Sequence, residues 1–483
     1  MNHNDALFDV HGDKTGLPLD KKRMISIGIA IGLFIVGALL PLSTYGENAA
    51  LALGLVLFVI TLWVSNTVPL LVPGICLAVG SVLLNILTLN DVNTTLGSSA
   101  IYPMMGLTLV SMGAENTNVT KRLSYFLLDK LGKRPSLILL AITIAGTVIS
   151  AFVSNIATTI MLGGIAAGIL SSMGEVPGNS KFGKALMILC PVSAAVGGAA
   201  LVNGSPAINA TGITILEGAS GMSVSYVEWA KIGVPCALLV ILPAWIIYTK
   251  TLGVKDAEVS KGIDVDYFIN KRKELGAISG SEIRWLVTVA VMLFFLLRGL
   301  PLPVAGLLFG LISVAPVIGT VDGSTAFKKL PWEAIIMCGM IPLFGTIFTS
   351  TGLADYFGSL ITPLIDGAPM FVIILVPALI MVVINSIFVN CGGGVLAICV
   401  GATAPIIAAM GYNPVFILLP TIFLANLTIT FGTHIQMMLT YGYNYWDMKD
   451  PILPGFLFSF AAAIIYSVVT VIVVPMTGMS FYL

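Results

Sequence analysis

Charged residues are scarce in this chain of 483 residues: they make up 10% of the sequence, whereas hydrophobic residues make up 57%. An ordinary soluble domain contains about 25% charged residues, so this composition excludes a soluble globular protein. The 23 basic and 23 acidic residues cancel and no long basic block occurs, which gives no sign of a nucleic-acid partner. A helix needs about 20 apolar residues to cross a bilayer, and runs of that kind recur along the chain. The composition therefore predicts an all-α, multi-pass membrane protein.

Motifs for catalysis and for disulfide bonding are missing too. The six cysteines occur singly in apolar segments without a CxxC spacing. The chain has no HExxH, GxSxG or GxxxxGK[ST] sequence, and no paired acids that would suit an intramembrane enzyme. We therefore expect a protein that is not an enzyme and has no cofactor. Residues 1–22 are polar, which argues against a cleaved signal peptide and predicts a cytoplasmic N-terminal tail.

Continuous apolar runs predict transmembrane helices, whereas interrupted runs predict hairpins or broken helices. The continuous runs cover 24–42, 48–65, 67–88, 229–249, 284–300, 303–319, 332–350 and 454–475. A short run covers 101–113, and four longer runs are interrupted by small or polar residues: 136–171 at FVSNIATT, 184–218 at VNGSPAIN, 369–411 at FVNCGGG and 414–442 at FGTHIQ.

The four interruptions come in the same order in each half of the chain, which suggests two repeats. Irregular backbone at membrane depth is tolerated where protein or a water-filled cavity satisfies it. Matched breaks in two halves are typical of inverted-repeat transporters, whose substrate site lies between the repeats. The alternative is that the small residues only allow helices to pack closely. We predict a first repeat over 23–249, a cytoplasmic linker over 250–283 and a second repeat over 284–483.

The distribution of basic residues tests this topology. We take 136–171 and 369–411 as re-entrant hairpins that do not cross, and the remaining eleven elements as transmembrane helices. With a cytoplasmic N-terminus, all basic residues except Lys231 and Arg298 then fall inside, which is 21 of 23. Such a bias is the positive-inside rule. We expect a plasma-membrane protein with its N-terminus in the cytoplasm and its C-terminus outside.

The four breaks are the candidate binding site. Helix halves that begin at a hairpin tip direct free N–H groups and a positive dipole end towards the site, which favours an anion. His434, in the fourth break, is the only histidine outside the N-terminal tail. Intramembrane ionisable residues are functional candidates, although a neutral histidine bonded to a carbonyl is the plainer alternative. The predicted substrate contacts are Ser154, Asn155, Thr158, Ser205, Pro206, Asn390, Cys391, Gly392, Thr433 and His434.

These motifs resemble the divalent anion/sodium symporter (DASS, or INDY) family of dicarboxylate and citrate transporters. Ser154 and Asn155 match that family's Ser-Asn-Thr hairpin tip, with Ile156 in place of threonine. Gly204, Ser205 and Pro206 match the following glycine, Ser/Thr-Pro-Pro-Asn break. The segment from Pro331, PWEAIIMCGMIPLFG, is similar to the helix before the second hairpin. The resemblance covers nearly the whole chain and implies a homodimer with elevator motion of a transport domain.

The second half departs from the family pattern. Its hairpin tip is Val389-Asn390-Cys391, which keeps only the asparagine, and its second break is Thr433-His434-Ile435-Gln436, which keeps only the threonine. The resemblance implies that Asn155 and Asn390 donate to the two substrate carboxylates. It also implies a first sodium site at Ser154, Asn155 and Gly204, whereas the second cation site is altered.

The altered second site favours one transport mode. A symporter needs cations to balance substrate charge, whereas an exchanger returns one anion for another. The sequence therefore predicts an electroneutral exchanger of dicarboxylates such as 2-oxoglutarate, malate or succinate, or of citrate. The alternatives are sodium-coupled symport, an anion channel and an intramembrane enzyme. A channel usually shows a filter repeated by symmetry.

Overall fold

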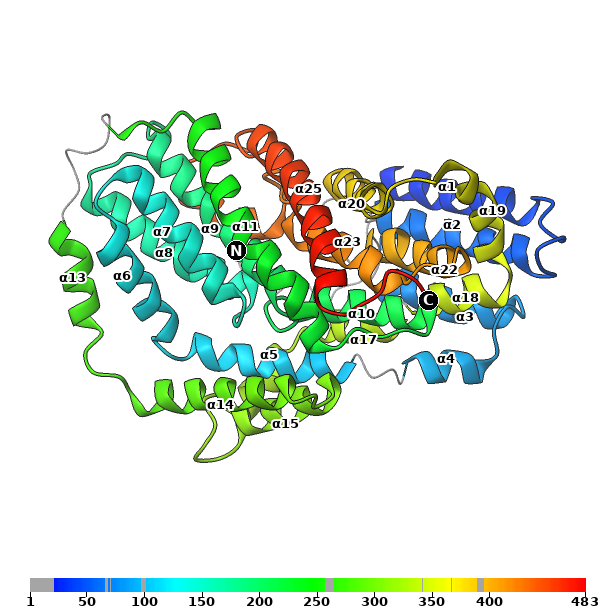
Figure 1. The fold of residues 1–483 in the computed structure, drawn as a ribbon, viewed down its shortest axis with the longest axis horizontal. Coiled ribbons are helices and arrows are strands. Elements are labelled where there is room, and N and C mark those ends of the chain that lie inside the picture. The colour runs from blue at the N-terminus through cyan, green and yellow to red at the C-terminus, as the bar shows by residue number, and fades with distance from the viewer. Residues whose placement is uncertain are drawn as a thin grey trace, which may run out of the picture.

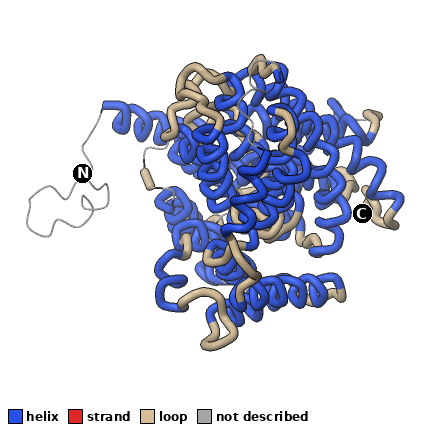
Figure 2. Tube along the Cα trace, turned by 90° about the vertical axis from the view of Figure 1, so that its left-hand side faces the viewer, coloured by secondary structure: helices blue, strands red, loops and turns tan. Residues whose placement is uncertain are grey.

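The computed structural model describes residues 21–65, 68–69, 71–96, 101–256, 265–340, 342–365, 367–388 and 395–483. Helices account for nearly all regular structure in these residues, as Figure 2 shows. The predicted N-terminal tail lies outside them up to residue 20, and so do 257–264 of the predicted linker and the second hairpin tip, 389–394.

The described residues of the first half form eleven helices. They are α1 (Lys21–Ala38), α2 (Ala49–Ser65), α3 (Leu71–Leu83), α4 (Leu89–Leu96), α5 (Ile101–Glu115), α6 (Val119–Leu131), α7 (Pro135–Ser150), α8 (Asn155–Ser172), α9 (Lys181–Ala200), α10 (Pro206–Ser220) and α11 (Tyr226–Thr251).

The second half begins inside the predicted linker. Its elements are α13 (Val265–Glu274), α14 (Gly280–Leu297), α15 (Leu302–Val314), α16 (Gly323–Lys329), α17 (Trp332–Met340), α18 (Leu343–Ser350), α19 (Leu353–Ile365), α20 (Met370–Ile387), the π-helix η2 (Ala397–Gly401), α22 (Thr403–Ala409), α23 (Pro414–Leu427), α24 (Ile435–Tyr441) and α25 (Ile452–Met476).

Six helices of the described residues are long and apolar enough to cross a membrane by length and composition: α8, α9, α11, α14, α20 and α25. Shorter apolar helices accompany them, so the expectation of an all-helical membrane protein is confirmed. One expected span differs. The run 332–350 is divided into α17 and α18, and α18 begins after Pro342, a residue that lacks the N–H needed inside a helix. The predicted linker is also more ordered than expected, since α13 lies within it.

Three of the four interrupted runs are broken where the sequence indicates, and the break at FVNCGGG lies outside the described residues. Helix α7 ends at Ser150 and α8 begins at Asn155, so the turn falls on the FVSN sequence. Helix α9 ends at Ala200 and α10 begins at Pro206. In the second half, α23 ends at Leu427 and α24 begins at Ile435, which makes the last break longer than FGTHIQ.

Contacts between helices repeat from one half to the other. Helix α7 packs on α9 as α20 packs on α23, and α11 packs on α9 as α25 packs on α23. The two sets then meet, because α11 contacts α25, and α9 and α10 contact α23. In Figure 1, α5, α14 and α15 lie along one edge, while α1, α2 and α19 gather at the other end.

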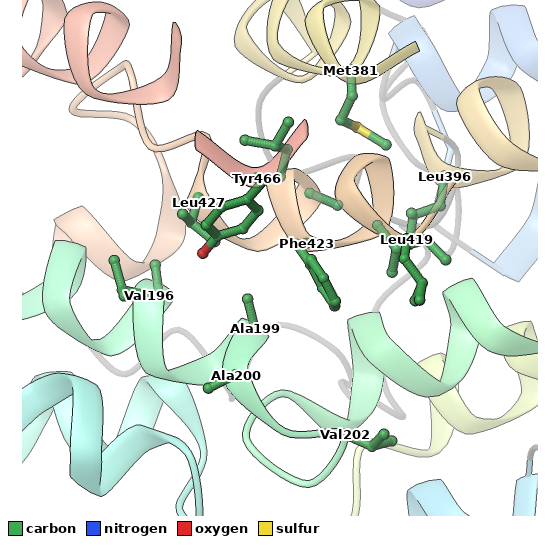
Figure 3. Close-up of a cluster of buried hydrophobic side chains, with 14 of the residues drawn as sticks. Val196, Ala199, Ala200, Val202, Met381, Leu396, Leu419, Phe423, Leu427 and Tyr466 are labelled. Carbon is green, nitrogen blue, oxygen red and sulfur yellow. The ribbon is translucent and has the colours of Figure 1, made fainter. Parts of the chain in front are cut away.

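The core lies where the two sets meet. Figure 3 shows Phe423 of α23 and Tyr466 of α25 opposite Val196 and Ala199 of α9. The Phe423 ring contacts Tyr466 edge to face at 5.7 Å and Trp229 of α11 at 4.9 Å. Trp229 also donates from Nε1 to the Ala199 carbonyl, at 3.2 Å. Such aromatic pairs add to burial energy, and here they fix the ends of α9 and α23, from which the broken segments start.

Candidate functional site

A cavity of about 620 Å³ opens between the first hairpin tip, the two helix breaks and helices α5, α16 and α17. Its walls consist of Thr108, Ser111, Met112, Glu115, Ser154, Asn155, Ile156, Ser205, Pro206, Ala207, Ile208, Thr211, Lys329, Pro331, Met337, Asn385, Leu396, Ala425, His434, Ile435 and Gln436. The volume is in the range of small-molecule sites. The cavity therefore brings together residues of all four interrupted runs, with Asn385 and Leu396 as the contributions of 369–411.

Ser154 fixes the start of α8 at the hairpin tip. Its hydroxyl caps the helix by accepting from the Ala157 N–H at 3.3 Å, and its own N–H donates to the Ser111 hydroxyl of α5 at 2.7 Å. The first N–H groups of a helix have no partner within the helix and carry a partial positive charge. The tip is therefore held against α5 with the positive end of an 18-residue helix at the cavity.

Asn155 presents an unused donor at the cavity wall. Its side chain is 4% exposed, its Oδ1 accepts from the Ser150 hydroxyl at 2.8 Å, and its Nδ2 has no hydrogen-bond partner among the described residues. A buried donor left unpaired costs about 1–3 kcal/mol. Gly198 of α9 makes room for this side chain, because a Cβ there would collide with Asn155 Oδ1. The amide is thus aligned before any ligand arrives.

The first break is tied to the hairpin by a short hydrogen-bond chain. Tyr226 Oη donates to Asn203 Oδ1 at 2.9 Å, and Asn203 Nδ2 donates to the Ala151 carbonyl at 2.9 Å. Ser205 then starts α10 without using its side chain as a cap, and that side chain lines the cavity. The start of the 15-residue helix α10 is therefore a second positive end at the same cavity.

Gly204 packs behind the cavity rather than on its wall. A Cβ at Gly204 would lie 2.5 Å from the Ser150 carbonyl oxygen and 3.0 Å from the Gly197 carbonyl oxygen. Carbonyl oxygens at an unwound segment are the groups that hold sodium in transporters. The donor set around Gly204, with Asn155 Oδ1 close by, is chemically suited to a sodium ion.

Two asparagines join the two breaks directly. Asn209 Nδ2 lies within hydrogen-bond distance of the carbonyls of Gly198 (2.7 Å), Leu201 (3.1 Å) and Val202 (3.2 Å). Asn209 Oδ1 accepts from Asn426 Nδ2 at 2.9 Å. Asn209 thus satisfies carbonyls that the end of α9 leaves free and links the two breaks by a hydrogen bond.

His434 begins the last short helix. Its Nδ1 accepts from the Gln436 N–H at 3.3 Å, which requires an unprotonated Nδ1 and leaves the proton of a neutral ring on Nε2. Both His434 and Gln436 line the cavity, and the buried Gln436 Oε1 has no partner among the described residues. His434 therefore caps α24 through Nδ1 and also places its ring at the cavity wall.

The structure separates the predicted contacts into three groups. Ser154, Asn155, Ser205, Pro206 and His434 line the cavity. Asn390, Cys391 and Gly392 lie outside the described residues. The remaining two do not line this cavity: Thr433 is exposed, and Thr158 is buried with a free hydroxyl at a second cavity of about 730 Å³ along α8.

Several cavity residues escaped the sequence argument. Asn385, which donates to the Ala425 carbonyl at 3.2 Å, is a lone amide in the apolar run of α20, and that contrast was the available signal. Glu115 and Lys329 end helices α5 and α16, and in sequence they are ordinary charged helix ends. Lys329 thus brings a lysine to the cavity wall.

The helices and the cavity define a multi-pass membrane protein with an internal site, and solved structures share its fold. The chain is similar to the YdaH transporter of Alcanivorax borkumensis, with a TM-score of 0.54, 14% identity and coverage of 82% of this chain and 90% of that one. It is also similar to MtrF of Neisseria gonorrhoeae, described with a class of antimetabolite efflux pumps, with a TM-score of 0.55, 12% identity and coverage of 79% and 83%. These likenesses concern the fold alone.

The chain belongs to the citrate transporter family, whose model matches residues 55–390. Curated relatives are named sodium-dependent dicarboxylate transporter SdcS. The protein from Staphylococcus saprophyticus is 24% identical over 448 residues, 84% of this chain and 83% of the relative. The protein from Staphylococcus aureus USA300 is 23% identical over 499 residues, 94% and 93%. The resemblance to dicarboxylate and citrate transporters is thus confirmed, and the chain is a multi-pass membrane transporter rather than an enzyme.

Proposed function

We propose that this protein carries C4 and C5 dicarboxylates, such as succinate, malate or 2-oxoglutarate, or citrate, across the plasma membrane. The family and the names of the relatives support this substrate class. The observation that carries the proposal is the unpaired Asn155 Nδ2, buried at a cavity where α8 and α10 both begin. An acidic substrate supplies the acceptor that this donor lacks and a negative charge that both helix ends favour.

Substrate recognition follows from these groups. One carboxylate accepts from Asn155 Nδ2 and lies near the Ser205 hydroxyl. The other lies towards His434, whose Nε2–H is a donor when Nδ1 caps α24. Asn390 is the predicted partner of that second carboxylate by resemblance. Neutral donors and helix ends hold the anion without an ion pair inside the cavity, so release costs less than it would from a buried arginine.

Transport mode is the finer part of the proposal. We favour electroneutral exchange, because the second-half motif keeps only Asn390 and Thr433 of the family pattern. Sodium-coupled symport is the second candidate, favoured by the names of the relatives and by the oxygen atoms around Gly204. In symport, sodium is a second substrate that enters beside Asn155 and lowers the electrostatic cost of the dianion.

Counterflow in proteoliposomes distinguishes the two modes. Purified protein is reconstituted with or without internal succinate, and uptake of labelled succinate is followed with and without a sodium gradient. Exchange predicts uptake that needs internal dicarboxylate and ignores sodium. Uptake that needs a sodium gradient and no internal dicarboxylate would establish symport instead. No uptake of any di- or tricarboxylate would reject the proposed substrate class.

The proposed motion is an elevator movement within a homodimer. The support is the composition of the cavity: one wall comes from α5, α16 and α17, and the other comes from the broken helices and the first hairpin. Movement of the second wall along the first exposes the cavity to alternate sides. Cysteine pairs across the two walls, cross-linked in either state, should stop uptake, and full uptake after complete cross-linking would rule the motion out.

A further inference from the structure

Two charged groups share one wall of the cavity. Among the described residues that line it, Glu115 and Lys329 are the only ones with a formal charge, since His434 accepts at Nδ1 as a neutral ring. Both are exposed and lie at the ends of their helices, α5 and α16. Lys329 is also close enough for its charge to act on the Glu115 carboxyl. The opposite wall offers only neutral amides, hydroxyls and backbone groups.

The position of Lys329 is fixed from both directions along the chain. Ala326 and Leu330 are buried in a small core with Met104 and Leu109 of α5. Trp332, just beyond, donates from Nε1 to the Phe327 carbonyl at 3.0 Å. The backbone at Lys329 is therefore anchored in a core to which α5 and, through Ala210, α10 contribute, and the lysine lies on the same wall as Glu115.

Helix α5, which ends at Glu115, is held by hydrogen bonds to neighbouring segments. The Trp285 indole of α14 donates to the Val110 carbonyl of α5 at 2.9 Å, and Asn116 Nδ2 donates to the Thr320 carbonyl at 3.3 Å. Glu115 thus ends a helix that is hydrogen-bonded to α14 and to the segment before α16. A substrate that enters the cavity therefore meets the charges of both residues.

We propose that Lys329 is a specificity-determining residue, which attracts di- and trivalent anions into the cavity through its charge, and that Glu115 opposes it and sets the size of the effect. The inference rests on the proposed function, because it names how the same site selects for substrate charge. A positive charge on the wall of a cleft raises the local concentration of anionic ligands, and the Glu115 carboxylate on the same wall offsets part of that effect. A neutral donor such as Asn155 forms a hydrogen bond with a carboxylate whatever the total charge of the ligand. A lysine attracts a trivalent anion more strongly than a divalent one.

Helix capping is the competing explanation. A lysine in the last turn of a helix is favourable for the dipole alone. Lys328 offers a matched control, since it ends the same helix, has the same charge and does not line the cavity. A role in capping or in net charge affects both residues alike, whereas attraction into the cavity affects Lys329 alone.

The test compares initial uptake rates for succinate and citrate in proteoliposomes. We expect Lys329→Gln to raise KM about tenfold with little change in kcat, and to raise it more for citrate than for succinate. Lys328→Gln should leave KM unchanged, and Lys329→Arg should restore it. Added salt should shrink the difference between wild type and Lys329→Gln, because exposed charges are screened within about 8–10 Å at physiological ionic strength.

Glu115→Gln keeps the inference testable if the lysine variant does not fold. Removal of the opposing charge should lower KM for both acids, most for citrate. Equal KM values in Lys329→Gln and Lys328→Gln, or an unchanged KM in Glu115→Gln, would overturn the inference. Wild-type protein that transports neither acid would instead remove the proposed function itself, so the two failures are distinguishable.

Discussion

Asn155 is the sharpest place to test the site, because its two side-chain atoms have different tasks. Oδ1 accepts from the Ser150 hydroxyl at 2.8 Å and holds the hairpin tip, whereas Nδ2 has no partner within the described residues. Asn155→Asp keeps an acceptor for Ser150 and replaces the free donor with a negative charge. Asn155→Ala removes both groups.

The expected loss follows from a single charge-assisted hydrogen bond. Such a bond contributes about 1.5–3 kcal/mol, which corresponds to a roughly 10- to 150-fold rise in KM for Asn155→Ala. In Asn155→Asp the new carboxylate also repels the substrate, so uptake should fall below detection. The lost Ser150 bond costs Asn155→Ala about 0.5–1.5 kcal/mol of stability, a modest drop that thermal unfolding in detergent will report.

The assay is succinate uptake in proteoliposomes together with stabilisation of the purified protein by succinate. Asn118→Asp is the matched control, since Asn118 precedes α6, makes no capping hydrogen bond with its side chain and does not line the cavity. Wild-type KM and uptake in Asn155→Ala would refute the assignment. The resemblance predicts the same loss for Asn390→Ala.

Three further predictions concern the cap of α24, helix packing and pH. His434→Asn keeps a capping side chain and loses the ring, so KM should rise with little loss of melting temperature. His434→Ala should lower both substrate affinity and melting temperature. Equal KM values in wild type and His434→Asn would leave His434 with a capping role only. Gly106→Val should destabilise the protein by about 1–3 kcal/mol, since a Cβ at Gly106 meets the facing carbonyl of α15. Gly28→Val is the control, because a Cβ at Gly28 meets no atom within 4 Å. Equal melting temperatures of the two variants would contradict this prediction. Asp322 caps α16, and hydrogen bonds, that from the Ser324 hydroxyl above all, lower the pKa of its carboxyl from 3.8 to about 2. Its contribution to stability is therefore complete above about pH 4 and lost as pH falls through about 2. The melting temperature should drop further in that window in wild type than in Asp322→Asn, which keeps the loss from other carboxylates such as Glu282, and parallel curves would argue against it.

Sequence patterns predicted the breaks in the helices well, for a physical reason. Small, polar and proline residues such as Ser154 and Pro206 act on the backbone within one turn, through capping and missing N–H groups. The local chemistry therefore suffices, and α8 and α10 begin where the motifs say. The break before Pro342 has the same cause but lay in a run that looked continuous.

Side-chain placement was predicted less well. Thr158 is on α8 with Asn155, yet it faces the second cavity, whose lining comes mainly from α6, α8 and α13. Thr433 fits the family pattern but is exposed, whereas Gln436 is buried at the cavity wall. Direction depends on which neighbour each residue meets, and spacing along the chain does not contain that information.

The sequence by itself determined that this is a membrane protein with too few charges for any soluble fold, and it determined where its helices are interrupted. Both follow from local transfer and backbone energies. Only the tertiary structure decided that Glu115 and Lys329, 214 residues apart, share a cavity wall with Asn155. That arrangement arises because α5 and α16 bury a common core and α10 and α23 meet through Asn209 and Asn426, contacts that exist only once distant helices have packed.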